Sequence, residues 1–280
     1  MDYGLFLAKT ATIVLAIAAI IILISILTKK KKSSRNETIE IRKLNEKFAE
    51  IESALNESVL EKDQLKALIK EQKKSEKDNK DNNDNKKRIF VLDFNGDIRA
   101  SAVSSLREEI TAILTIAREE DEVFLKLESG GGMVHAYGLA ASQLLRIRNR
   151  NIPLTIAVDK VAASGGYMMA CVGNVIIAAP FAVIGSIGVI AQVPNFNKLL
   201  KKYDIDYNEF TAGEYKRTVT VFGENSDQAK AKFNEQLEDT HVLFKEFINQ
   251  NRPNVDIAKV STGEHWFGTR ALEKNLVDEL

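Results

Sequence analysis

Histidine and cysteine are scarce in this 280-residue chain, and their scarcity limits the chemistry open to it. The single cysteine, Cys171, excludes an internal disulfide framework and a cysteine-based metal site. None of the three histidines lies between His135 and His241, so the usual base for a serine nucleophile is missing from the middle of the sequence. The sequence holds no metal-ligand cluster and no nucleotide-binding motif, and we therefore expect no metal and no cofactor.

The net charge is zero, because 39 basic residues balance 39 acidic ones. This balance argues against nucleic acid as a partner.

The charged residues are unevenly distributed along the chain. Residues 10–28 carry no charge and, as a helix, would span roughly 28 Å, close to the hydrocarbon thickness of a bilayer. This run is longer than the core of a signal peptide, and no Ala-x-Ala site precedes the lysines at 29–32. Residues 1–28 are predicted to be a retained transmembrane anchor.

The chain after the anchor is mostly polar. Residues 29–70 are predicted to be a basic flank and a helical stalk with an apolar stripe at alternating spacings of three and four. The stripe consists of Ile41, Leu44, Phe48, Ile51 and Leu55. It is typical of a helix that rests on a membrane or on its own domain, and equally of a short coiled coil between protomers. Residues 71–88 contain no apolar side chain and are predicted to be a disordered, charged linker.

Residues 89–280 are predicted to form one α/β domain. The expected strands are 89–94, 123–127 and 154–158, and the expected helices are 105–117, 133–146, 167–172 and 226–249. The first helix is placed by a capping-box sequence, Ser-Leu-Arg-Glu, at its start. Strands that alternate with helices predict a mostly parallel sheet, and ligands of such sheets bind at the carboxyl ends of the strands.

Ser164 follows one of these strands and is surrounded by small residues that let a substrate carbonyl approach its hydroxyl. A serine at the start of a helix has backbone N–H groups and a positive dipole end beside it. The N–H of Gly165, the next residue, is well placed to bind an oxyanion. The alternative interpretation is that Ser164 only caps the helix that follows.

Two further segments could complete such a site. The three glycines at 130–132 follow another strand and could supply a second oxyanion donor, although a simple tight turn has the same sequence. Lys216 could accept the serine proton if burial disfavoured its ammonium form, although most lysines are solvated surface charges. Ser186 lies in the Gly-Ser-Ile-Gly sequence at 185–188 and could orient the lysine.

Taken together, these residues resemble the signal peptide peptidase A family of membrane-bound Ser-Lys peptidases. The resemblance covers nearly the whole chain and is strongest at residues 125–192, 211–217 and 262–266. It implies a ClpP/crotonase-like fold of repeated β-β-α units, preceded by the anchor and the stalk. It also implies a bacterial inner-membrane protein whose substrates are signal-peptide remnants or other extended, membrane-associated peptides.

By that resemblance Ser164 is the nucleophile, Lys216 the general base, and Gly131 and Gly165 form the oxyanion hole. The lysine of this family can come from a neighbouring protomer, so a homo-oligomer is an expected partner. One departure concerns Gly130, which stands where the family usually has proline. We expect this glycine to make the turn more flexible and to weaken activity without abolishing it.

Two questions stay open at this point. The lysines at 29–32 predict that the domain after the anchor is cytoplasmic, whereas relatives that clear signal peptides have their site at the outer face. The function also has two rivals to the peptidase. A crotonase-type acyl-CoA enzyme would keep the glycine turns, and a catalytically weak or inactive membrane scaffold would keep the stalk and the linker.

Overall fold

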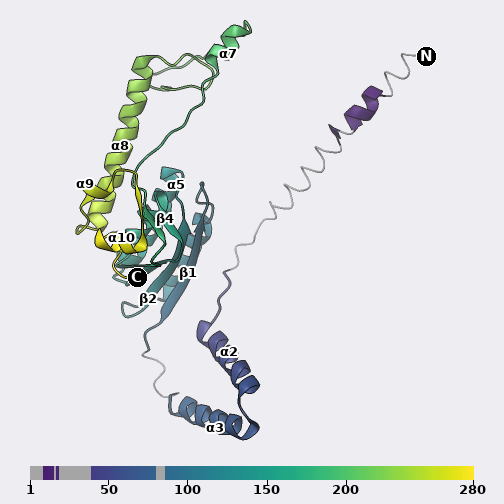
Figure 1. Ribbon diagram of the computed structural model, residues 1–280, viewed down its shortest axis with the longest axis vertical. Coiled ribbons are helices and arrows are strands. Elements are labelled where there is room, and N and C mark those ends of the chain that lie inside the picture. Colours follow the sequence, from purple (N-terminus) through teal and green to yellow (C-terminus); the bar gives the residue numbers. More distant parts are fainter. Residues whose placement is uncertain (1–8, 16, 19–38, 80–85) are drawn as a thin grey trace. The chain divides into compact units, whose positions relative to one another are not determined.

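The computed structural model describes residues 9–15, 17–18, 39–79 and 86–280 (Figure 1). The chain divides into two compact units, Met1–Lys62 and Asp63–Leu280. Within the described ranges, no helix combines the length and the apolar character that crossing a bilayer requires. Most of the predicted anchor lies outside the described residues.

The predicted stalk is two helices rather than one. Helix α2 spans Leu44–Val59 and helix α3 spans Lys62–Asn79. The backbone of Leu60 is extended, with φ −89° and ψ 146°, and this ends α2. Helix α3 continues through residues 71–79, which the sequence predicted to be disordered. Its Lys, Glu and Gln residues have good intrinsic helix propensity, and a helix needs no buried face of its own to form locally.

The second unit contains a seven-stranded sheet in the described part of the chain. Its strands are β1 (Ile89–Gly96), β2 (Glu122–Ser129), β3 (Leu154–Val158), β4 (Val161–Ala163), β5 (Val175–Ala178), β6 (Val183–Gly185) and β7 (His265–Phe267). Every pair of neighbouring strands is parallel except β6 and β7. The prediction of an α/β domain with mostly parallel strands is therefore confirmed.

The sheet divides at β2, and this division places the candidate site. Strand β1 pairs with β2 along its full length, so that Gly96 lies opposite Ser129. The other edge of β2 pairs first with β3, at residues 123–126, and then with β4, where Ser129 lies opposite Ala162. The carboxyl ends of β1, β2 and β4 consequently meet. The glycine turn after β2 is brought next to the residues that follow β4.

Seven helices of the described second unit follow α3. They are α4 (Val103–Ile116), α5 (Val134–Arg148), α6 (Gly165–Ala170), α7 (Asn197–Lys202), α8 (Asp227–Asn251), α9 (Ile257–Val260) and α10 (Gly268–Glu273). The predicted capping box is wrong, because α4 begins at Val103 and Ser105 lies inside its first turn without capping it. Helix α8 does have a capping serine, since Ser226 accepts a hydrogen bond from the Ala229 N–H at 3.1 Å.

The core lies between the sheet and the helices α4, α5 and α6. Inward residues of the strands, such as Leu125 and Ile156, are fully buried, and so are Leu144 and Ile147 of α5. Each large aliphatic side chain buried in this way stabilises the fold by about 1.5–3 kcal/mol. Helix α6 is buried along its entire length, which fixes the residue that precedes it.

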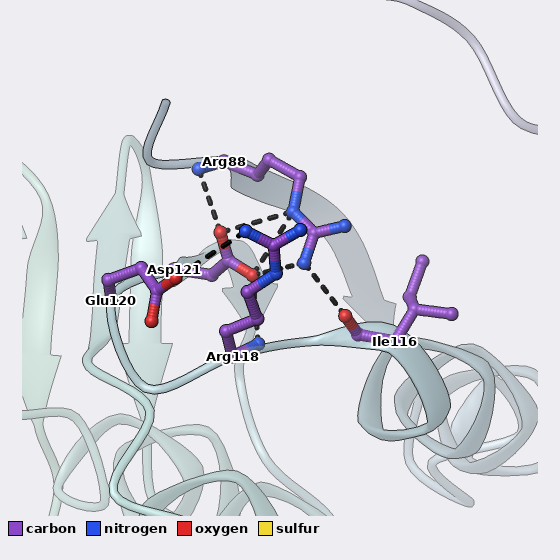
Figure 2. A network of polar contacts seen from close by, with 5 residues as sticks. All are labelled: Arg88, Ile116, Arg118, Glu120 and Asp121. Carbon is purple, nitrogen blue, oxygen red and sulfur yellow. Dashed lines mark hydrogen bonds and ion pairs between the residues drawn. The ribbon is translucent and has the colours of Figure 1, made fainter. Parts of the chain in front are cut away.

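An ion pair between Arg88 and Asp121 connects the start of β1 to the loop before β2 (Figure 2). The Asp121 carboxylate is almost completely buried and contacts the Arg88 guanidinium at 2.6 Å. It also accepts the backbone N–H groups of Arg88 and Arg118, each at 2.9 Å. The guanidinium donates a further hydrogen bond to the carbonyl of Ile116 at 2.7 Å. The hydrogen bonds from Arg88 hold the pKa of the Asp121 carboxyl well below its usual range.

Residues 189–225, between β6 and α8, form a projecting segment that we call the arm. Figure 1 shows its helix α7 beyond the far end of α8, away from β4. The arm is held to itself by backbone contacts, such as the hydrogen bond from the Phe196 N–H to the Val221 carbonyl at 2.7 Å. Its surface carries several exposed apolar side chains, of which Phe210 is 94% exposed.

Candidate active site

Ser164 occupies the sharp turn between β4 and α6. Its φ of 53° and ψ of −120° lie in a region that L-residues rarely adopt. The Ser164 N–H donates to the carbonyl of Gly185 on β6 at 2.7 Å, and its carbonyl accepts the N–H of Met168 at 3.0 Å. Although Ser164 is the N-cap residue of α6, its side chain makes no capping hydrogen bond. The interpretation of Ser164 as a simple cap is therefore wrong.

A backbone conformation of this kind costs of order 1–3 kcal/mol and persists only where its surroundings hold it. Here the hydrogen bond to β6 holds one side of the turn and the buried helix α6 holds the other. The turn leaves the Ser164 side chain half-buried, and its hydroxyl has no hydrogen-bond partner among the described residues. A strained strand-to-helix turn that presents a hydroxyl is a geometry suited to a nucleophile.

Gly131 lies directly against this turn. A β-carbon built on Gly131 would come within 2.8 Å of the Ser164 β-carbon and 2.6 Å of the Gly165 nitrogen. Gly131 also has a φ of +87°, so a larger residue would be strained there in any case. The structure thus brings together three residues that the sequence singled out, although they follow two different strands.

A chain of hydrogen bonds stabilises the glycine turn at residues 130–132. The Gly131 N–H donates to Ser129 Oγ at 3.1 Å. The same serine oxygen lies 2.5 Å from the Tyr137 hydroxyl. Tyr137 donates in turn to the carbonyl of Asp97 at 2.7 Å, so the serine must be the donor to the tyrosine. In this state the Gly131 N–H points at Ser129, and an oxyanion would compete with that serine for it.

Neither Ser129 nor Tyr137 was predicted from the sequence. Ser129 could have been found, because the buried positions of β2 alternate and the last of them falls on this serine. A polar group at a buried strand position needs a partner. No sequence pattern identifies Tyr137 as that partner. Burial raises the pKa of the Tyr137 phenol, which keeps it protonated and able to donate.

Lys216 lies on the arm and is exposed. Its backbone N–H donates to the carbonyl of Gly213 at 3.1 Å, and among the described residues its side chain forms no hydrogen bond or ion pair with Ser164. The neighbouring Arg217 pairs with Glu209 at 3.2 Å, which holds the two ends of this loop together. Within the described part of a single chain, the candidate base is therefore exposed and makes no polar contact with the nucleophile.

Ser186 lies next in sequence to a residue that is hydrogen-bonded to the nucleophile. It follows Gly185, the residue that accepts the Ser164 N–H, and its own N–H donates to the carbonyl of Glu264 at 2.7 Å. Its φ of 52° shows that this turn is strained like the one at Ser164. A cavity of about 470 Å³ lies between the arm and the start of α8, but neither Ser164 nor Lys216 lines it.

Among the described residues, no group of three or more His, Cys, Asp and Glu side chains could hold a metal ion. Cys171 is buried in α6's C-terminal turn, and burial raises the pKa of its thiol. Its place in the core agrees with a packing role.

Comparison with known proteins gives matches along nearly the whole chain. Residues 1–144 match Peptidase family S49 N-terminal, and residues 146–280 match Peptidase family S49. "Probable protease SohB" of Haemophilus influenzae is 54% identical over 290 positions, which cover 99% of this chain and 82% of that protein. A protein of the same name from Buchnera aphidicola subsp. Schlechtendalia chinensis is 51% identical over 292 positions, with 100% and 95% covered.

Proposed function

The chain belongs to peptidase family S49, and we propose that it is a serine endopeptidase that works through a dyad of Ser164 and Lys216. The observation that carries this proposal is the strained turn at Ser164, which presents the hydroxyl beside Gly131 and Gly165. A scaffold without catalysis has no need for a strained serine next to these two glycines. Family membership also disfavours an acyl-CoA substrate.

In the proposed reaction the Lys216 amine takes the proton of Ser164 Oγ as that oxygen attacks a peptide carbonyl. The negative charge develops on the carbonyl oxygen, where the N–H groups of Gly165 and Gly131 would stabilise it. The leaving amine receives the proton from the lysine, and an acyl-enzyme remains on Ser164. Water, deprotonated by the same lysine, then hydrolyses the ester and regenerates the serine.

The exposure of Lys216 supports assembly of this dyad between protomers. A lysine acts as a base only where burial disfavours its ammonium form, and a single chain leaves this side chain in solvent. The arm that carries it has an exposed apolar surface that includes Phe210, Ile190 and Tyr203, at 94%, 79% and 64% exposure. A homo-oligomer that covers this surface would bury the lysine against the Ser164 of a neighbour.

Apolar side chains beside the glycine turn support an apolar peptide substrate. Ile98 is 70% exposed, and Met133 and Val134 are each 43% exposed. They share one edge, because the Met133 N–H donates to the carbonyl of Ile98 at 2.8 Å. We propose that they contact extended, membrane-derived peptides such as signal-peptide remnants. Retention of residues 1–28 as an anchor in the bacterial inner membrane is part of the same proposal, with the side of the domain left open.

One observation favours a second candidate, a weakly active or inactive membrane scaffold. The Gly131 N–H is already engaged by Ser129 Oγ, and Gly130 stands beside it without the rigidity of a proline. Such a protein would keep the fold and the oligomer but would not hydrolyse peptides. It predicts that replacement of Ser164 has no effect in any hydrolysis assay.

The test is hydrolysis of casein or a fluorogenic peptide by the full chain purified in detergent. Ser164→Ala and Lys216→Ala should each lose activity, whereas Lys198→Ala, another exposed lysine of the arm, should keep it. Mixing the two inactive variants should restore part of the activity if the dyad forms between protomers. Full activity in Ser164→Ala would refute the nucleophile, and an inactive wild type would favour the scaffold.

A further inference from the structure

Helix α2 presents an apolar stripe that nothing in its own unit covers. Its members recur at spacings of four, three and four and are exposed by 36%, 61%, 47% and 61%. They are Leu44, Phe48, Ile51 and Leu55. No residue of the helix is buried. Four large side chains along one face of a mostly polar helix indicate a surface that binds another apolar surface.

The stripe has the heptad form of a two-stranded coiled coil. Leu44 and Ile51 take d positions, and Phe48 and Leu55 take a positions, so the flanking g and e positions are defined. One g position is Lys47, and the e position five residues later is Glu52. Neither side chain forms a salt bridge within the described part of the chain. Both are available to a partner helix.

These two charges distinguish a parallel from an antiparallel pair. In a parallel pair, a g residue faces the e residue of the next heptad on the partner helix, so Lys47 would meet Glu52 twice. In an antiparallel pair that keeps the same core, g faces g and e faces e. Lys47 would then meet Ala54, and Glu52 would meet Asn45. Only the parallel pair satisfies both charges.

The charge of the helix also argues against a lipid surface as the occupant of the stripe. Helix α2 carries four glutamates and one lysine. Helices that lie on anionic membranes are rich in Lys and Arg on their polar face, and acidic helices are repelled there. The same acidic helix is compatible with a second copy, because its lysine is placed opposite a glutamate.

We propose that α2 pairs in parallel with α2 of a second copy of this chain, through the stripe and two Lys47–Glu52 contacts. A helix of 16 residues holds only about two heptads, so the pair is weak in isolation. Tethering both helices in one assembly supplies the effective concentration that such a short contact needs. The proposal does not depend on the Ser164–Lys216 dyad, because it rests on a different part of the chain.

Disulfide cross-linking of the full chain tests the pairing and its direction. Ser58 is the next d position, near the end of α2, and its replacement leaves all four stripe residues in place. Ser58→Cys should cross-link rapidly under mild oxidation only in a parallel pair. The matched control is Ser53→Cys, the same substitution at an f position on the opposite face of the helix, which should cross-link at least ten-fold more slowly. The native Cys171 is buried and should not interfere.

Charge exchange provides the second test, at low salt, where ion pairs are least screened. In the Ser58→Cys background, Lys47→Glu alone and Glu52→Lys alone should each slow cross-linking several-fold. The double exchange should restore it, and so should a mixture of the two single variants, which pairs opposite charges. Adding Ser164→Ala should change none of these rates, which separates this result from failure of the proposed peptidase.

The proposal is overturned if Ser58→Cys and Ser53→Cys cross-link at the same rate. It is also overturned if neither charge variant alters the rate, because the stripe would then pair without the predicted register. Binding of the stripe to anionic lipid vesicles, in place of cross-linking, would assign the surface to the membrane. Cross-linking is read from a gel, and vesicle binding from co-sedimentation of the same variants with the vesicles.

Discussion

The ring of Tyr137 lies against Gly165 so closely that a β-carbon at residue 165 would overlap it. The hydroxyl of the same tyrosine connects to Gly131 through Ser129. One fully buried side chain therefore touches Gly165 directly and is linked to Gly131 through Ser129. The spacing between the two glycine turns depends on the shape of this tyrosine.

Gly165→Ala should be severely impaired, because the new methyl group would displace the Tyr137 ring or the turn at Ser164. We expect kcat to fall about 10²–10³-fold, the effect of losing one oxyanion donor. The free energy of unfolding should fall by about 1–3 kcal/mol, as for other overpacked sites. The control is Gly138→Ala in α5, where a β-carbon meets nothing within 4 Å. Wild-type kcat in Gly165→Ala would contradict the assignment.

Ser164→Gly should inactivate the enzyme and at the same time stabilise the fold. Glycine adopts a φ of 53° without strain, so the variant would recover part of the roughly 1–3 kcal/mol stored in the turn. After the entropic cost of a glycine, we expect a net gain of about 1 kcal/mol, or roughly 2–4 °C in Tm. Ser164→Ala keeps the β-carbon and should be inactive without that gain. Thermal unfolding of the three proteins measures the difference.

Gly130→Pro should raise activity a few-fold. A β-carbon at this position meets nothing within 4 Å, and the preceding residue already belongs to strand β2, as proline requires. Fixing the backbone should also stabilise the fold by about 0.4–1 kcal/mol. Comparison of kcat/KM and Tm with the wild type checks both effects. A proline variant that is folded but less active would mean that the turn needs its flexibility.

Acid should destabilise the fold through Asp121, whose folded pKa lies below its unfolded value. Its contribution is fully present above about pH 4, the ordinary range of an aspartate, and is lost as the pH falls from there toward the folded pKa. Asp121→Asn should lower stability by about 2 kcal/mol at about pH 7. Its urea-unfolding free energy should also change less than that of the wild type between about pH 4 and about pH 2. Parallel curves for both proteins would contradict this explanation.

The parallel direction of the three longest strands and the meeting of the glycine turns were predictable, whereas the four shorter strands β4–β7 were not predicted. Parallel strands place their carboxyl ends at one edge, so residues that follow different strands, such as Gly131 and Ser164, were expected to meet. The family resemblance supplied the same residues independently. Membership of the peptidase family is confirmed, whereas the roles of Ser164 and Lys216 stay predictions.

What the sequence could not predict depends on side chains that meet across long separations. The pairing of Arg88 with Asp121, and of Ser129 with Tyr137, has no local signature. The start of α4 was misplaced because a capping-box sequence also fits the first turn of a helix that begins earlier. The break at Leu60 went unnoticed because α2 and α3 both have helical composition.

The position of helix α5 limits how sequences of this family can be recombined. The two matched segments of the family meet at residue 145, inside this helix, whose Leu144 and Ile147 are fully buried on either side of that border. Gly131 belongs to the first segment and Ser164 to the second. The proposed nucleophile and one proposed oxyanion glycine therefore lie in different matched segments, which are joined through one buried helix. Recombination between relatives at this border would succeed only where both parents share the buried face of α5.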